Sequence, residues 1–98
     1  MERLREGEIA QRLSRLPGWQ VVSGILSRTF RFASFPEALT FVNQVGALAE
    51  EAHHHPDIDV RYDRVRLGLV THDAGGLTEK DFELAEAADS VAMGIRAE

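Results

Sequence analysis

The chain has no cysteine, and this absence removes two classes of protein. Without thiols it can form neither a disulfide framework nor a thiolate metal site. It also lacks any apolar run approaching the roughly 18 residues that would span a membrane. The start of the sequence, MERLREGEIA, is charged and lacks the apolar core of a secretory signal. We therefore expect a cytoplasmic protein with no membrane partner.

An excess of positive charge is absent as well. Eleven Lys and Arg residues stand against sixteen Asp and Glu residues, and the net charge of -5 argues against a nucleic-acid partner. The 98 residues predict a single domain, 1–98, with an ordinary globular composition of 44% hydrophobic and 28% charged residues. A core of this size gives modest stability unless copies associate.

Three segments have helical signals. Apolar residues at helical spacing predict a helix within residues 4–16, which starts near residues 6–8 and ends at Pro17-Gly18. The sequence SFPE is a capping box at 34–37 and predicts a helix over 36–54 that Pro56 stops. A second capping box, TEKD at 78–81, precedes the last helix.

Four segments read as strands. WQVVS and ILSRTFRF flank a turn at Gly24 and are rich in β-formers. DIDVRY alternates, with Ile58, Val60 and Tyr62 on one face, and RVRLGLV alternates in the same way. The order is α-β-β-α-β-β-α. Two hairpins and three helices favour an α+β fold, with an antiparallel sheet and the helices packed on one face.

All four histidines fall in one segment, as the consecutive His53, His54 and His55 and then His72. A two-residue turn at 63–64 would place Val60 opposite Leu67 and, in the same register, His55 opposite His72. Directly opposed residues have Cβ atoms roughly 4.5 to 5.5 Å apart. This register predicts two imidazoles together at the open end of the hairpin.

Converging imidazoles beside a helix end could donate and accept protons on one bound molecule, because histidine changes charge near neutral pH. Other interpretations stay open. A histidine at a helix C-terminus often only caps it, and imidazole also suits zinc, copper or nickel, although zinc usually gains a Cys, a spaced His or a carboxylate. Asp81 could simply close its capping box, Trp19 could be a core or rim aromatic, and Glu50 could lie on a solvated face.

These residues resemble the signature of the pterin-4a-carbinolamine dehydratases. The pattern E-x3-H-H-P falls on Glu50, His54, His55 and Pro56, and Tyr62, Thr71-His72 and Asp81 follow at the family's spacing. The sequences PGW at 17–19, FRFASFPEALTFVNQVGALAE from residue 30 and GLTEKD before the last helix are also similar to the family. The resemblance covers nearly the whole chain.

The resemblance implies a four-stranded antiparallel sheet with three helices on one side, in homodimers or homotetramers. It implies dehydration of 4a-hydroxytetrahydrobiopterin to quinonoid dihydropterin in tetrahydrobiopterin recycling, with a pterin as the small-molecule substrate and neither cofactor nor metal. The family's active-site residues fall on His54, His55, His72 and Asp81, and its pterin-binding positions on Glu50, His55 and Trp19.

The chemistry of the reaction suggests individual roles. We assign His54 and His72 to proton transfer, His55 to holding the pterin and Asp81 to orienting an imidazole. A non-catalytic binding or dimerisation module on the same scaffold is the first alternative, since a fold does not fix a function. A histidine-rich metal-binding domain is the second.

Overall fold

The computed structural model describes residues 2–96 and confirms the predicted order of elements. The helices are α1 (Glu6–Leu13), α2 (Phe35–Ala52) and α3 (Glu79–Arg96). The strands are β1 (Gln20–Val22), β2 (Ile25–Arg31), β3 (Asp57–Arg61) and β4 (Arg64–Leu69), and a short 3₁₀ helix, η1 (His72–Ala74), follows β4. None of the described helices is long and apolar enough to cross a membrane.

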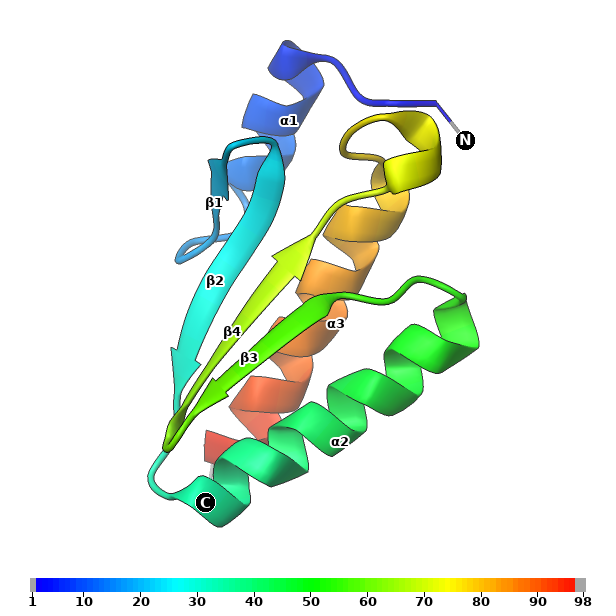
Figure 1. Ribbon diagram of the computed structural model, residues 1–98. Coiled ribbons are helices and arrows are strands. Elements are labelled where there is room, and N and C mark those ends of the chain that lie inside the picture. The colour runs from blue at the N-terminus through cyan, green and yellow to red at the C-terminus, as the bar shows by residue number, and fades with distance from the viewer. Residues whose placement is uncertain (1, 97–98) are drawn as a thin grey trace.

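The four strands form one antiparallel sheet in the order β1-β2-β4-β3. The last strand, β4, therefore lies between β2 and β3 and pairs with both. Figure 1 shows the long helices α2 and α3 side by side along the sheet, with α1 at the end where α3 begins. The predicted α+β class, a four-stranded antiparallel sheet with three helices, is confirmed.

The core lies between the sheet and the helices. Strands β2 and β4 supply its central layer, and α2 covers that layer with side chains spaced three or four residues apart, as a helical stripe requires. Phe30 of β2 meets Phe41 of α2 with ring centroids 4.7 Å apart. Both rings are buried, so truncation of either to alanine should cost about 3–5 kcal/mol. The fully buried residues include Leu26, Phe30, Ala38, Phe41, Val45, Val65, Leu67, Leu69, Ala85 and Ala88.

Two helices end earlier than the sequence predicts. The chain after Leu13 tightens into turns, in which the Arg15 and Leu16 N–H groups donate to carbonyls three residues back at 3.1 and 3.0 Å. Helix α2 ends at Ala52 rather than at residue 54, because His53 adopts a left-handed conformation with φ 52°. At its start, the Ser34 hydroxyl accepts from the Glu37 N–H at 3.3 Å, which confirms the predicted N-cap.

The predicted register of the last hairpin is wrong. Val60 lies opposite Val65, and Ile58 lies opposite Leu67, so the turn is Tyr62-Asp63 rather than 63–64. A shift of two residues keeps the same faces inward, but Tyr62 has φ 54° and is 72% exposed rather than buried. In the observed register Asp59 opposes Arg66, and opposite charges on facing strands stabilise a pair.

This register also removes the predicted opposition of His55 and His72. Strand β3 begins at Asp57 and β4 ends at Leu69, so neither histidine belongs to the ladder. His55 lies in the link between α2 and β3, and His72 opens η1. Any cooperation between these two side chains has to arise from the loops at this end of the sheet.

Candidate active site

The three consecutive histidines lie on a helix end of the Schellman type. The His53 N–H donates to the Glu50 carbonyl at 3.2 Å, and the His54 N–H donates to the Ala49 carbonyl at 3.1 Å. These are the two bonds that close such a motif, whose left-handed position is usually glycine. Here His53 takes that position. The sharp reversal gives three neighbouring imidazoles three different surroundings, with His54 buried and His53 and His55 exposed.

His54 contacts the start of α3. Its Nε2 lies 2.6 Å from Oδ1 of Asp81, in a pair whose side chains are 10% and 0% exposed. Asp81 is 27 residues further along the chain, so this contact depends on the packing of α2 against α3. A short bond to a charged group in a buried setting is stronger than the same bond on the surface. The structure thus brings together two of the residues that the sequence singled out.

The second carboxylate oxygen of Asp81 caps α3. Oδ2 accepts from the Thr78 N–H at 2.8 Å and from the Thr71 hydroxyl at 2.9 Å. The Thr71 and Thr78 hydroxyl oxygens are 2.8 Å apart, and the Lys80 N–H donates to Thr78 Oγ1 at 3.3 Å. The capping and catalytic interpretations of Asp81 are therefore compatible, because each oxygen has its own partner. No buried side-chain polar atom of the described residues lacks a hydrogen-bond partner.

This network determines which nitrogen of His54 carries the proton. A carboxylate only accepts hydrogen bonds, and Asp81 Oδ2 already accepts two. With Oδ1 also accepting, the partner nitrogen of His54, Nε2, is the protonated one. A carboxylate that fixes the tautomer and ring plane of a histidine is a recurrent arrangement in acid–base catalysis. Nδ1 is left as the ring atom available for a further proton.

His55 has a weaker partner. Its Nε2 lies 3.3 Å from Oε2 of Glu50, five residues earlier, and the two side chains are 61% and 76% exposed. A pair so open to solvent contributes little to stability. Its exposure instead leaves donors and acceptors free for a ligand. The predicted binding residues Glu50 and His55 thus lie together, outside the buried pair.

His72 is exposed on η1, and its ring makes no hydrogen bond to any other part of residues 2–96. The position of His72 is constrained through the preceding residue, Thr71, whose hydroxyl donates to Asp81. Asp81 therefore connects the segments that contain His54 and His72. It bonds to His54 directly, and it bonds to Thr71, the residue before His72. Figure 1 shows η1 close to the start of α3.

Trp19 lies elsewhere. Its indole N–H donates to Oδ1 of Asp89 at 2.9 Å, its ring packs edge-on against Phe30, and it is 5% exposed. Asp89 is two turns beyond Asp81 on α3, roughly 12 Å along the axis. Arg28 joins the same carboxylate at 2.8 Å. The structure makes Trp19 a core aromatic, and its predicted contact with a pterin has no support among these contacts.

An arginine near Asp89 and Arg28 has a shifted pKa. Burial lowers the pKa of Arg96, and the nearby Arg28 lowers it further, while Asp89 opposes both. Arginine remains protonated through such shifts, so this group has no role in proton transfer near neutral pH.

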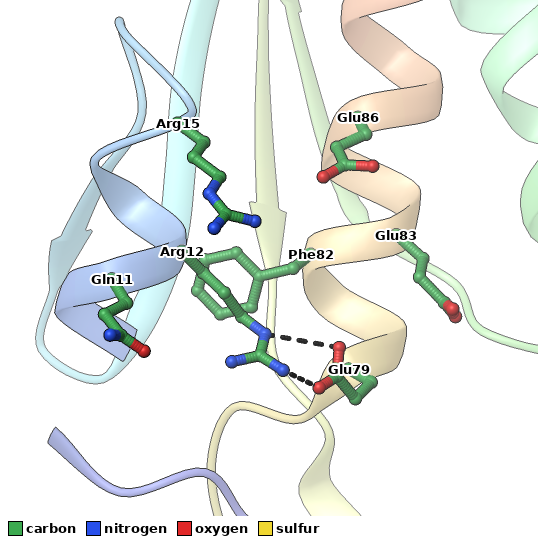
Figure 2. Close-up of a pocket in the computed structure, with 7 residues that line it drawn as sticks. All are labelled: Gln11, Arg12, Arg15, Glu79, Phe82, Glu83 and Glu86. Atoms are coloured by element: carbon green, nitrogen blue, oxygen red, sulfur yellow. Dashed lines mark hydrogen bonds and ion pairs between the residues drawn. The ribbon is translucent and has the colours of Figure 1, made fainter. Parts of the chain in front are cut away.

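An ion pair fixes α1 to the first turn of α3. Figure 2 shows the Arg12 guanidinium bonded to both carboxylate oxygens of Glu79, and the Nε–Oε2 distance is 3.2 Å. A cavity of about 290 Å³ lies beside this pair, between the two helices. None of the predicted site residues lines it. The pair instead braces the helix turn that contains Asp81.

Within residues 2–96, no group of three or more His, Cys, Asp or Glu side chains has the arrangement of a metal site. His54 and Asp81 form only a pair, and their contacting atoms already satisfy one another. The other three histidines are exposed, His53 and His55 after the end of α2 and His72 on η1.

Sequence reasoning missed the two threonines. Thr71 and Thr78 complete the hydrogen bonding of Asp81, a role that the sequence patterns did not predict for either residue. The signal for Thr78 was its place as the first residue of a capping box. Nothing in the local pattern around Thr71 indicates a partner ten residues away.

Comparison with known proteins identifies the family of the chain. The family model described as pterin 4 alpha carbinolamine dehydratase matches residues 2–91. A relative from Chloroflexus aurantiacus, named "Putative pterin-4-alpha-carbinolamine dehydratase", is 59% identical over 93% of this chain and 98% of its own. A relative of the same name from Thermomicrobium roseum is 54% identical over 87% of this chain and 91% of its own.

Two solved structures are also similar. A protein of Brucella melitensis, described as a transcriptional coactivator/pterin dehydratase, has a TM-score of 0.90 and 36% identity over 93% of this chain and 99% of its own. A pterin dehydratase-like protein, described as a RuBisCO assembly factor in the alpha-carboxysome, has a TM-score of 0.63 and 27% identity over 76% of this chain and 86% of its own. The sequence and structural matches together show that the chain belongs to the pterin 4 alpha carbinolamine dehydratase family.

Proposed function

We propose that this protein dehydrates 4a-hydroxytetrahydrobiopterin to quinonoid dihydropterin and water by histidine acid–base catalysis, as a step of tetrahydrobiopterin recycling. Membership of the family supports the substrate class. The observation that carries the proposal is the buried contact of His54 with Asp81 at 2.6 Å, beside the segment that contains His72. The reaction requires no electron transfer, and the proposed mechanism uses no cofactor.

The reaction needs one acid and one base. The C4a–O bond breaks as the departing hydroxyl takes a proton and leaves as water. The proton on N5 is removed, and its electron pair forms the N5–C4a double bond. Each proton transfer, made by a positioned side chain, typically contributes 10²- to 10⁴-fold to the rate. Solvent then returns both side chains to their starting protonation states.

We assign the two transfers to His54 and His72. Asp81 holds His54 through Nε2, so Nδ1 is the atom that exchanges a proton with the substrate. His72 has no internal hydrogen bond among the described residues, and its exposed ring is free to contact a bound pterin. His55 and Glu50, paired at 3.3 Å on the surface, form the binding contact. Asp81 acts as a positioning residue through His54.

A non-catalytic module remains the second candidate. The observation that favours it is the similarity to a protein described as a RuBisCO assembly factor, which shares this scaffold at 27% identity. Such a role would leave the His54–Asp81 pair as a structural element that fastens α2 to α3. The module would bind a protein partner and would leave the carbinolamine unchanged.

The deciding experiment is a spectroscopic assay of the reaction. An aromatic amino acid hydroxylase generates the 4a-carbinolamine in situ, and the formation of quinonoid dihydropterin is followed with and without this protein. We expect clear acceleration by the unmodified chain and by His53→Gly, a matched control in which the altered histidine belongs only to the helix end. We expect little acceleration by His72→Ala. An unmodified protein that leaves the spontaneous rate unchanged would overturn the dehydratase proposal.

A further inference from the structure

A short segment at the start of the chain lies across the loop that contains His72. Figure 1 shows the segment of residues 2–5, before α1, running above η1. The Leu4 N–H donates to the Leu77 carbonyl at 2.8 Å, which fastens this segment beside the loop's last residues. Leu77 is buried, and Leu4 packs against the core. An open groove of about 1070 Å³ runs between the segment, η1 and the β1–β2 turn.

The closest fit is between Arg3 and Gly76. A Cβ atom added to Gly76 would lie 2.8 Å from Cγ of Arg3 and would overlap its Cδ. Real Cβ atoms essentially never approach another atom so closely, so the Arg3 stem occupies the space that only a glycine leaves free. The backbone of Gly76 is not in the left-handed region, in contrast to that of Gly75 with φ 75°. Glycine at position 76 therefore accommodates the Arg3 side chain, and it is not needed for a left-handed backbone conformation.

The loop is held on its other side by the active-site network. Thr71 and Gly76 exchange backbone hydrogen bonds of 3.2 and 3.3 Å, and the Gly75 N–H donates to the His72 carbonyl at 3.0 Å. The Thr71 side chain reaches Asp81. The Thr71–Gly76 bridge is thus bonded to Asp81 on one side through the Thr71 hydroxyl, and on the other side the Arg3 stem packs on Gly76. The Arg3 guanidinium adds only a marginal contact to the Gly75 carbonyl at 3.5 Å.

We infer that Arg3 is a positioning residue for the proposed dehydration, which holds the His72 loop in place by packing its aliphatic stem on Gly76. The kinetic part of this inference rests on the proposed function. His72 has no hydrogen bond of its ring within the described chain, so its position depends on the backbone of a three-residue 3₁₀ helix. A misplacement of about 1 Å in a catalytic group can cost 10²-fold in rate.

The test is a double-mutant cycle on Arg3 and Gly76. Gly76→Ala displaces a flexible side chain rather than backbone, so the protein should fold. We expect kcat to fall about tenfold in Gly76→Ala and in Arg3→Ala, with pterin affinity changed less than threefold. The double variant should lose no more than the worse single variant, because both changes break one contact. Arg3→Met, which retains an aliphatic stem, should restore most of the rate.

The matched control is Gly46→Ala in α2, where an added Cβ meets nothing within 4 Å. It should retain the unmodified kcat. The inference is overturned if both single variants keep their rates, if their losses multiply in the double variant, or if Arg3→Met fails to restore turnover.

A second measurement does not depend on catalysis. Amide hydrogen exchange at Gly75 and Gly76 reports opening of the loop, because both N–H groups are bonded within it. We expect exchange about tenfold faster in Arg3→Ala and in Gly76→Ala, and unchanged exchange at the His54 amide of the α2 terminus. If the unmodified protein lacks dehydratase activity, the proposed function fails while this result still decides whether Arg3 holds the loop. Unchanged exchange at Gly75 and Gly76 would refute the positioning role.

Discussion

His54 and His55 are adjacent in the sequence but differ in burial and in hydrogen-bond partner. His54 is enclosed and bonded to Asp81 at 2.6 Å, whereas His55, the next residue, is 61% exposed on its side chain and 3.3 Å from an exposed Glu50. The difference arises at the end of α2, where the left-handed conformation of His53 reverses the direction of the chain. Neighbouring imidazoles thereby acquire separate surroundings, His54 bonded to a buried carboxylate and His55 open to solvent.

The largest effect should follow from changing the anchor of the buried histidine. Asp81→Asn keeps the shape of the side chain but removes its charge, and its amide can donate to His54 Nε2 and force the other tautomer. We expect unfolding free energy to fall by about 1.5–3 kcal/mol, the range for hydrogen bonds to a charged group. Turnover should fall about 10²- to 10⁴-fold. Urea denaturation and the spectroscopic assay measure the two losses, and a variant with normal turnover would remove His54–Asp81 from the mechanism.

His72→Ala should separate rate from stability. His72 is exposed, so unfolding free energy should change by less than about 1 kcal/mol, with melting temperature and oligomeric state retained. The rate should fall about 10²- to 10⁴-fold, and pterin binding should weaken less than turnover, because a proton-transfer group acts mainly in the transition state. Steady-state kinetics and calorimetry together test this. Retained turnover, or loss through unfolding, would make His72 structural.

His55→Ala, in contrast to His72→Ala, should weaken pterin binding more than it lowers turnover. Its partner Glu50 is also exposed, so stability should be almost unchanged. Loss of one binding contact should weaken pterin affinity by up to about tenfold, with a smaller decrease in kcat. Equilibrium titration with a pterin measures this directly, and Glu50→Gln is the companion variant. A larger decrease in kcat than in affinity would assign His55 to proton transfer.

His53→Gly tests the turn that separates the two environments. Glycine adopts a positive φ without the strain that His53 bears at φ 52°, so the substitution stabilises the folded state. Glycine also gives the unfolded chain more conformational freedom, which offsets part of this gain. We expect a net stabilisation of up to about 1 kcal/mol by denaturation, with activity unchanged. Destabilisation beyond that amount would show that the His53 side chain has a contact of its own.

Removal of metal should have the smallest effect. A bound structural metal contributes several kcal/mol or more to folding. We expect tag-free protein to contain no stoichiometric zinc, copper or nickel, and a chelator to leave its melting temperature unchanged. Elemental analysis and thermal unfolding provide the measurements. One equivalent of metal, lost together with stability on chelation, would replace the acid–base proposal with a metal site.

The local patterns predicted much of the fold because they depend on neighbouring residues. Ser34 begins α2 through its own side chain, and Ile58 and Val60 face inward because strand residues alternate. The turn of the last hairpin was misplaced by one residue at each end, since Tyr62-Asp63 lacks the glycine that marks most two-residue turns. The end of α2 was misplaced by two residues for the same reason, as His53 stands where glycine is usual.

The sequence by itself determined the order of elements, the faces that form the core and the residue types of the proposed site. Only the tertiary structure decided that β4 lies between β2 and β3, that Trp19 bonds to Asp89, and that Asp81 bonds both His54 and the start of α3. The physical reason is distance along the chain. A cap or an alternating strand is fixed within a few residues, whereas the partner of the buried His54 imidazole lies 27 residues away and is fixed by the packing of two helices.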